Sequence, residues 1–338
     1  MAKIAALLVL FVGAVSGGEA ETFLSSCCAF TPIELERLAK SEAIARLIRS
    51  PDREMSILGA VKLRTSKEEF LTWFRNLDNF KLMPIVAEVK MFHNPPRPED
   101  LTALSLDTQE VREARNCVPG KCGLKLSSEE MERIKKGVDW ALPDAHSKAT
   151  DQARAMLLDY VKDYFARGNA ALGKLNDRGA GSSIAETFTA LNANFPYLKE
   201  AFPEVFKELM TFHGMGRSSQ DQFVYWSREK YGFGLKPLLN IIHVSIFKQR
   251  PDVILIASQQ IRSTHYFDGS FGVTMLVDAP GGAYLVYINR SRIDMLRDAG
   301  WLKRTLIERS LPGATRREMI GIRDRVGKTY VAQPRLKD

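Results

Sequence analysis

Two histidines, a tyrosine and an asparagine occur within apolar segments, where polar side chains are uncommon. His243 and His265 lie on consecutive segments, and Tyr287 and Asn289 are two residues apart, so they share one face of an extended strand. Imidazole, phenol and amide groups donate or accept hydrogen bonds, and ligand pockets are mostly apolar with a few such groups. The alternative is that each histidine is a hydrogen-bonded structural residue. Whether the four side chains point the same way depends on strand register, which the sequence leaves open.

The segment Val253–Phe267 adds a guanidinium, Arg262, to these groups. Alternate residues of a strand face opposite ways, which places Arg262 with Gln260 on one face and His265 on the other. Both faces mix apolar and polar residues. The mixture is typical of a pocket lining, although one core face and one solvated face would give the same pattern. Our ligand-binding candidates are His243, Arg262, His265, Tyr287 and Asn289.

Signatures of established catalytic sites are missing from the chain. It has no GxSxG, HExxH, GxGxxG or GxxxxGK[ST] pattern, and the five histidines have no pair at metal-ligand spacing. The sequence therefore predicts no catalytic group, no metal and no cofactor. An enzyme that acts through His265 and Tyr287 on an apolar or cyclic substrate remains an alternative hypothesis.

Four apolar segments carry the candidates and indicate an antiparallel meander. Gly, Pro and Asp residues separate them, as in tight turns. The segments are Leu239–Lys248, Val253–His265, Phe271–Val277 and Ala283–Arg290. After Arg290 the hydrophobic period becomes helical almost to the end, and Pro312-Gly313 is expected to break that helix.

The N-terminal part predicts two more strands, and each of them follows a helix. The expected order is a helix from Pro32 through Ile48, a strand over Met55–Arg64, a helix from Glu68 to Leu77 and a strand over Ile85–Phe92. Thr31 fits the cap of the first helix, and Ser66 with Glu69 forms a capping box for the second.

Residues 101–234 have a mainly helical pattern. We expect a short strand at Gly123–Leu126, then helices near Pro143–Lys174, Ile184–Asn194, Pro203–Phe212 and Ser219–Tyr231. Antiparallel strands with segregated helices predict an α+β fold. The predicted organisation is a signal peptide at 1–20, the first helix and strands at 21–100, a helical insertion at 101–234, and the meander with the C-terminal helix at 235–330.

Both ends of this pattern resemble the helix-grip fold of the START and SRPBCC superfamily. The resemblance is carried by Met55–Leu63 followed by the helix Glu68–Leu77, and by Gly282–Arg290 leading into Trp301–Arg304. It implies a curved antiparallel sheet that grips a long C-terminal helix around a cavity. It also implies that a lipid or other apolar small molecule binds between the sheet and that helix. The helical insertion departs from the family pattern.

The N-terminus has the pattern of a secretory signal. Lys3 precedes the apolar run Ile4–Val15, and small residues follow up to Ala20. Cleavage after Ala20 and cleavage near Gly17 both fit, and an uncleaved anchor is the alternative. No other stretch is long and apolar enough to cross a membrane. The sequence predicts an exported protein, either periplasmic or secreted.

Export favours a disulfide between Cys117 and Cys122, because disulfides persist in oxidising compartments. Pro119-Gly120 supplies the turn between the two sulfurs. Cys27 and Cys28 are adjacent in sequence, and four cysteines allow three connectivities, so their pairing stays open. A metal site at Cys117 and Cys122 is the weaker alternative, since no histidine is close in sequence.

The net charge is +8, and the basic excess lies late in the chain. The apolar positions of the C-terminal helix alternate with many lysines and arginines, which fits either a helix packed on the sheet or peripheral contact with an anionic membrane. No nucleic-acid recognition motif is present, so nucleic acid is not an expected partner. A third hypothesis is an envelope protein that binds a partner through residues 101–234.

Overall fold

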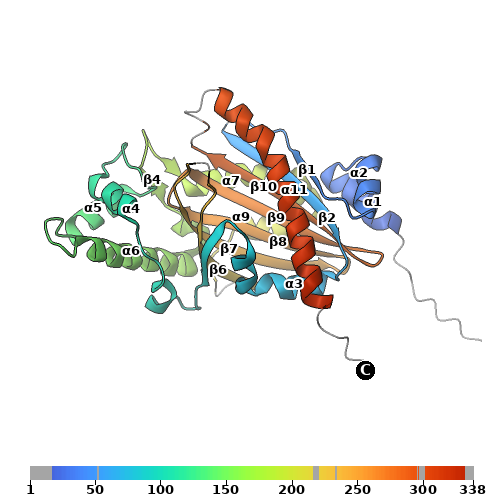
Figure 1. Ribbon diagram of the computed structural model, residues 1–338, viewed down its shortest axis with the longest axis horizontal. Helices are drawn as coiled ribbons and strands as arrows, with labels where there is room; N and C mark the ends of the chain where they lie inside the picture. Colours follow the sequence, from blue (N-terminus) through green and yellow to red (C-terminus); the bar gives the residue numbers. More distant parts are fainter. Residues whose placement is uncertain are drawn as a thin grey trace, which may run out of the picture.

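The computed structural model describes residues 17–51, 53–215, 221–232, 234–294, 296 and 301–331. The fold is α+β, with a large antiparallel sheet, a long C-terminal helix that crosses it, and several helices on the other side (Figure 1). The predicted fold class is confirmed.

The main sheet has eight strands, and its order joins the two ends of the chain. Strands β2 and β10 are paired over ten residues, so the N-terminal strands complete the C-terminal meander. In spatial order the strands are β1 Ile44–Leu47, β2 Glu54–Leu63, β10 Gly282–Ile293, β9 Phe267–Ala279, β8 Val253–Ser263, β7 Leu238–Arg250, β6 Asp221–Glu229 and β3 Val86–Met91.

Four of the described helices begin at capping boxes. Capping boxes at Thr31–Glu34, Ser66–Glu69, Asp107–Glu110 and Ser127–Glu130 start α2, α3, α4 and α5. The helices are α1 Gly17–Cys28, α2 Pro32–Ala39, α3 Lys67–Arg75, α4 Thr108–Asn116, α5 Ser128–Gly137, α6 Ala145–Arg167, α7 Ile184–Ala193, α8 Pro196–Ala201, α9 Pro203–Met210 and α11 Trp301–Val331. Short elements complete the fold: 3-10 helices η1 Leu77–Leu82, η2 Pro98–Leu101 and η3 Gly168–Ala171, and strands β4 Lys174–Leu175 and β5 Ser182–Ser183.

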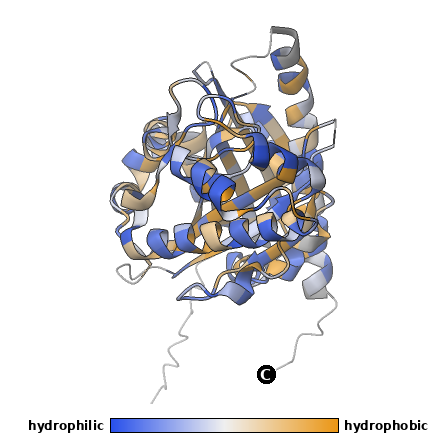
Figure 2. Ribbon diagram, turned by 90° about the vertical axis from the view of Figure 1, so that its left-hand side faces the viewer, coloured by the Kyte–Doolittle hydropathy of each residue, from blue (hydrophilic) through white to orange (hydrophobic). Residues whose placement is uncertain are grey.

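Helices cover the sheet on both sides. One side, which we call the α11 face, packs Val61, Leu276 and Leu285 against α3 and α11. The opposite side, the α7 face, packs Phe271 and Ile288 and their neighbours against α1, α7, α8 and α9. Figure 2 shows the resulting layers, with hydrophobic strands inside and helices whose outward sides are hydrophilic. None of the described helices is apolar and long enough to span a bilayer.

Helix α11 packs closely on the sheet at Gly59 of β2. A Cβ atom at Gly59 would lie 2.8 Å from Cγ2 of Thr315 and 3.1 Å from Cγ of Met319. Met319 and Val326 are buried, whereas no described side chain between positions 304 and 318 is. The second half of α11 is therefore the part that anchors it to the sheet.

Four sequence predictions are wrong. Ser219–Tyr231 was expected to be a helix, but Asp221–Glu229 is β6; it has apolar residues on both faces, such as Phe223 and Val224, and so lacks a clear alternation. The first helix does not reach Ile48, because Ser41 has a positive φ of 61° after α2 and Ile44–Leu47 pair with β2.

The other two errors concern backbone regularity. Gly123–Leu126 is not a strand. The amide of Lys125 donates to the carbonyl of Thr264, the amide of Leu124 donates to Sγ of Cys122, and the carbonyl of Leu126 accepts from the amide of Asn176. Pro312 lies inside α11 without ending it. A proline removes one helical hydrogen bond, and the packing of Met319 and Val326 holds the turns that follow. The predicted signal residues 1–16 lie outside the described chain, and 17–20 begin α1.

Candidate functional site

Polar and small side chains gather on the α11 face toward the C-terminal ends of β6, β8 and β10, where a sheet that packs on a helix would be apolar. Strand register places them in adjacent rows across β6 to β10: Asn289 pairs with Gly272, and Ser270 pairs with both Ser291 and Gln260. We call this set the polar floor; its members are Ser227, Glu229, Asn240, Ser258, Gln260, Ser270, Gly272, Tyr287, Asn289 and Ser291.

Part of the polar floor is exposed although its strands are central. Ser258, Ser270, Tyr287 and Asn289 are half-buried. On the other side of the same strands, residues such as Phe271 are fully buried. The helices thus cover the α7 face at this point and leave these four residues of the polar floor partly exposed.

Hydrogen bonds fix most of the floor. Nδ2 of Asn289 donates to Oγ of Ser270 at 2.9 Å, and Oγ of Ser291 donates to Oδ1 of Asn289 at 2.7 Å. Nε2 of Gln260 donates to Oδ1 of Asn240 at 2.8 Å. Oε1 of Gln260 is buried and has no partner among the described residues. An unsatisfied buried acceptor is costly, so this atom marks a place where a donor would be stabilised.

Glu229 is the one charged residue of the floor. It is 9% exposed, and it accepts hydrogen bonds from Oγ of Ser227 and from the hydroxyl of Tyr231, both at 2.6 Å. Burial is the largest cause, and the Glu229 charge the second, of a raised pKa in three nearby tyrosines. The pKa of Tyr287 is raised to about 12, and the pKa values of Tyr225 and Tyr231 are raised more strongly. The three phenols are therefore neutral, and that of Tyr231 contacts the Glu229 carboxylate directly.

Aromatic rings border the floor on the side of α3 and η1. The ring centroids of Phe80 and Tyr225 are 5.6 Å apart, those of Phe74 and Phe80 are 5.5 Å apart, and those of Phe223 and Tyr225 are 6.2 Å apart. Phe74 and Phe80 are only partly buried. The site therefore combines a polar floor with an apolar border, which is the composition expected of a small-molecule site.

The five predicted site residues fall into separate places. Tyr287 and Asn289 lie together in the polar floor. His243 lies on the α7 face, where its Nδ1 pairs with the Tyr164 hydroxyl of α6 at 2.9 Å and its ring is 4.6 Å from that of Phe212. Burial lowers the pKa of His243 to about 3, so the ring is neutral and acts as part of the core.

Arg262 also belongs to the α7 face, because a register shift between Ile241 and Ile242 turns the end of β8. Its guanidinium donates to Glu130 of α5 at 2.5 Å and lies 5.2 Å from the centroid of the Tyr160 ring. This buried pair attaches the helical segment to the sheet. The prediction that Arg262 and Gln260 share one face is wrong, because the bulge places them on opposite faces of the sheet.

His265 lies at the end of the sheet, beside the disulfide loop. Its Nδ1 donates to the carbonyl of Gly123 at 2.8 Å, and its Nε2 is buried without a partner among the described residues. Cys117 and Cys122 form the predicted disulfide. No hydrogen bond or ring contact joins His265 to Tyr287, and the two residues belong to different sites.

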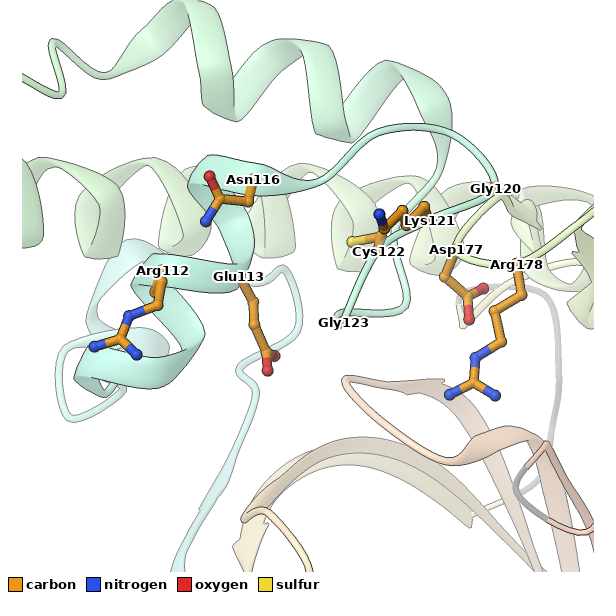
Figure 3. A pocket seen from close by; sticks show the side chains of 9 residues that line it. All are labelled: Arg112, Glu113, Asn116, Gly120, Lys121, Cys122, Gly123, Asp177 and Arg178. Carbon is orange, nitrogen blue, oxygen red and sulfur yellow. The ribbon is translucent and has the colours of Figure 1, made fainter. Parts of the chain in front are cut away.

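The disulfide loop borders an open pocket of about 490 Å³. Figure 3 shows Glu113 of α4 pointing toward the turn at Gly123, with Asp177 and Arg178 on the far side. Glu113 pairs with Lys236, and Asp177 lies 3.4 Å from Lys125. The carboxylates of this pocket are therefore already paired.

Lys125 forms the centre of a buried charge cluster behind that pocket. It is 2% exposed, and its Nζ lies 2.7 Å from Asp268 and 3.1 Å from Asp294, in addition to Asp177. Although burial opposes the charge, the three carboxylates raise the pKa of Lys125. The cluster ties the disulfide loop and the β4–β5 region to the ends of β9 and β10, so its role is structural.

Sequence reasoning missed Glu229, Asn240 and Gln260. Asn240 and Gln260 are polar residues within apolar strand segments, the same signal that singled out Asn289. Glu229 gave no such signal because its segment was assigned to a helix. Within the described part of the chain, no group of three potential metal ligands is present. Comparison of the chain with family models, with curated proteins and with solved structures finds no match.

Proposed function

We propose that this protein is an exported binding protein that holds a lipid or other small molecule with a large apolar part on the α11 face of the sheet, alongside α11. The observation that carries the proposal is the polar floor. Its half-buried hydroxyl and amide groups lie on the central strands of a sheet whose opposite face is fully packed. A buried polar group costs stability unless it is hydrogen-bonded, and Oε1 of Gln260 in this floor has no partner among the described residues.

The contact at Gly59 restricts where the ligand lies. Thr315 and Met319 press on β2 there, so the ligand cannot pass beneath α11 at that point. The polar floor begins on β10, the next strand, and extends to β6. The ligand therefore lies beside α11, over β10 to β6, with its polar end on the floor and its apolar part against Phe74, Phe80 and Ile242.

Two further features support the proposal. An antiparallel sheet with a long C-terminal helix packed on it is what the helix-grip resemblance implies. The Cys117–Cys122 disulfide is compatible with an exported protein. The basic C-terminal helix, which includes the exposed Leu306, fits peripheral contact with an anionic membrane from which a lipid would be taken.

No specific observation favours an enzyme that uses His265 and Tyr287, since these residues lie in different sites. The helical segment likewise gives no argument for a separate partner-binding module. Its α7, α8 and α9 bury the α7 face of the sheet, and α6 covers the adjoining end.

Native mass spectrometry tests the proposal. The protein is purified from the compartment in which it resides, without detergent, and measured before and after incubation with a lipid extract of the same cells. We expect an added mass of one amphiphilic molecule per chain that denaturation releases. Protein that carries no such molecule and takes none from the extract would overturn the proposal.

A further inference from the structure

We infer that the ligand carries a protonated amine, which binds Glu229 in the polar floor. The inference rests on the proposed function, because it names the polar group of the ligand that the floor holds.

The first argument is the charge of Glu229. This carboxylate is 9% exposed and forms no ion pair with a lysine, arginine or histidine among the described residues. Its two hydrogen bonds come from neutral hydroxyls, those of Ser227 and Tyr231. A buried charge is stable when an opposite charge pairs with it. A cation on the ligand would supply that charge.

The second argument is the remaining hydrogen-bond capacity. Gln260 is 9% exposed, its Nε2 is used by Asn240, and its Oε1 has no partner in the described chain. Ser227 lies opposite Asn240 in the pairing of β6 with β7, and its hydroxyl donates to the Glu229 carboxylate. Asn240 and Ser227 therefore lie between Gln260 and Glu229. The floor therefore offers acceptors. An ammonium group would bring N–H donors and a positive charge to such a floor, whereas a carboxylate or phosphate would meet acceptors and a like charge.

The third argument is the aromatic setting. Tyr225, Tyr231 and Tyr287 are close enough to Glu229 for its charge to raise the pKa of each phenol. The faces of tyrosine rings attract cations, and more strongly where water is excluded. Carboxylate, amide oxygen and aromatic rings together make a site for an amine with an apolar tail.

Isothermal titration calorimetry with three C8 probes tests the inference at pH 7: octylamine, 1-octanol and octanoate. The amine is protonated at this pH, as a lysine is. We expect octylamine to bind at least about tenfold more tightly than 1-octanol, and octanoate to bind most weakly. Glu229→Gln should lower octylamine affinity to that of 1-octanol and leave 1-octanol unchanged. The matched control is Glu88→Gln. Glu88 lies on the neighbouring strand β3, opposite Arg228 in the pairing of β3 with β6.

The ranking of the three probes on the unaltered protein decides the question even where Glu229→Gln does not fold. If 1-octanol or octanoate binds as tightly as octylamine, the amine inference is overturned and the proposed function stands. If none of the three binds, the proposed function fails together with the inference.

Discussion

The ring of Tyr287 on β10 lies over Gly272 on β9. A Cβ atom at Gly272 would be 3.3 Å from Cε2 and 3.6 Å from the hydroxyl of Tyr287. The glycine therefore lets the phenol lean across the neighbouring strand within the polar floor. The position of the phenol depends on this missing side chain.

Gly272→Val should block the polar floor without unfolding the protein. The added methyl groups push the Tyr287 ring outward and occupy the space above Ser258, while a β-branched residue is well tolerated in a strand. We expect at least about a tenfold loss of affinity for an amphiphilic ligand, measured by titration calorimetry. Gly173→Val is the control, because an added Cβ there meets nothing within 4 Å. Equal binding by both variants would show that the ligand lies elsewhere.

Gly59→Val should loosen α11. The new side chain would collide with Thr315 and Met319, and overpacking of this kind costs about 1 to 3 kcal/mol. Urea unfolding measures the loss of free energy. Gly327→Ala, near the end of the same helix with open space around it, should leave stability unchanged or slightly higher. An unaltered midpoint for Gly59→Val would mean that α11 does not press on β2.

Lys125→Met should destabilise the protein strongly. The substitution leaves Asp177, Asp268 and Asp294 without their shared cation, and breaking a buried pair in this way costs about 3 to 5 kcal/mol. The free energy of unfolding in urea gives the value. Lys121→Met, four residues away and exposed, is the comparison. Similar small losses in the two variants would argue against the charge cluster.

His243 should make stability depend on pH in acid. Its pKa is 6.5 when unfolded and about 3 in the fold, so below pH 6.5 the unfolded chain binds a proton that the folded chain does not. This contribution to stability is complete above pH 6.5 and is lost as pH falls toward 3, by up to about 1.4 kcal/mol per pH unit. His243→Gln should flatten the curve over this window. His213→Gln, an exposed histidine, should follow the unaltered protein; a parallel curve for His243→Gln would contradict the buried neutral ring.

Removing the disulfide should cost about 2 kcal/mol, because the bond closes only a short loop. The double substitution Cys117→Ser and Cys122→Ser tests this by urea unfolding. Thiol titration of unfolded, unreduced protein should find Cys27 and Cys28 reactive and the other two protected. Four reactive thiols in protein from its own compartment would contradict an oxidised, exported molecule.

The meander could be predicted because its strands are separated by Gly, Pro and Asp turns. The shared face of Tyr287 and Asn289 could be predicted because residues two apart in a strand lie on one face in any register. His243 and Arg262 could not be placed from the sequence. His243 faces α6, and the bulge at Ile241 turns Arg262 toward α5. Glu229 was missed because β6 is apolar on both faces and its periodicity resembles a helix. The pairing of distant strands is a property of the whole chain, and the local pattern around each residue does not contain it.

Photoaffinity labelling with a diazirine-bearing alkylamine tests the central claim most directly, because it shows where a ligand lies. After irradiation and digestion, we expect the label on peptides that contain Tyr287, Ile242 or Phe223, on the α11 face around the polar floor. Excess octylamine should suppress it. Labelling confined to the exposed Leu306 or to the pocket beside Cys122, with these peptides unlabelled, would contradict a ligand site on the α11 face.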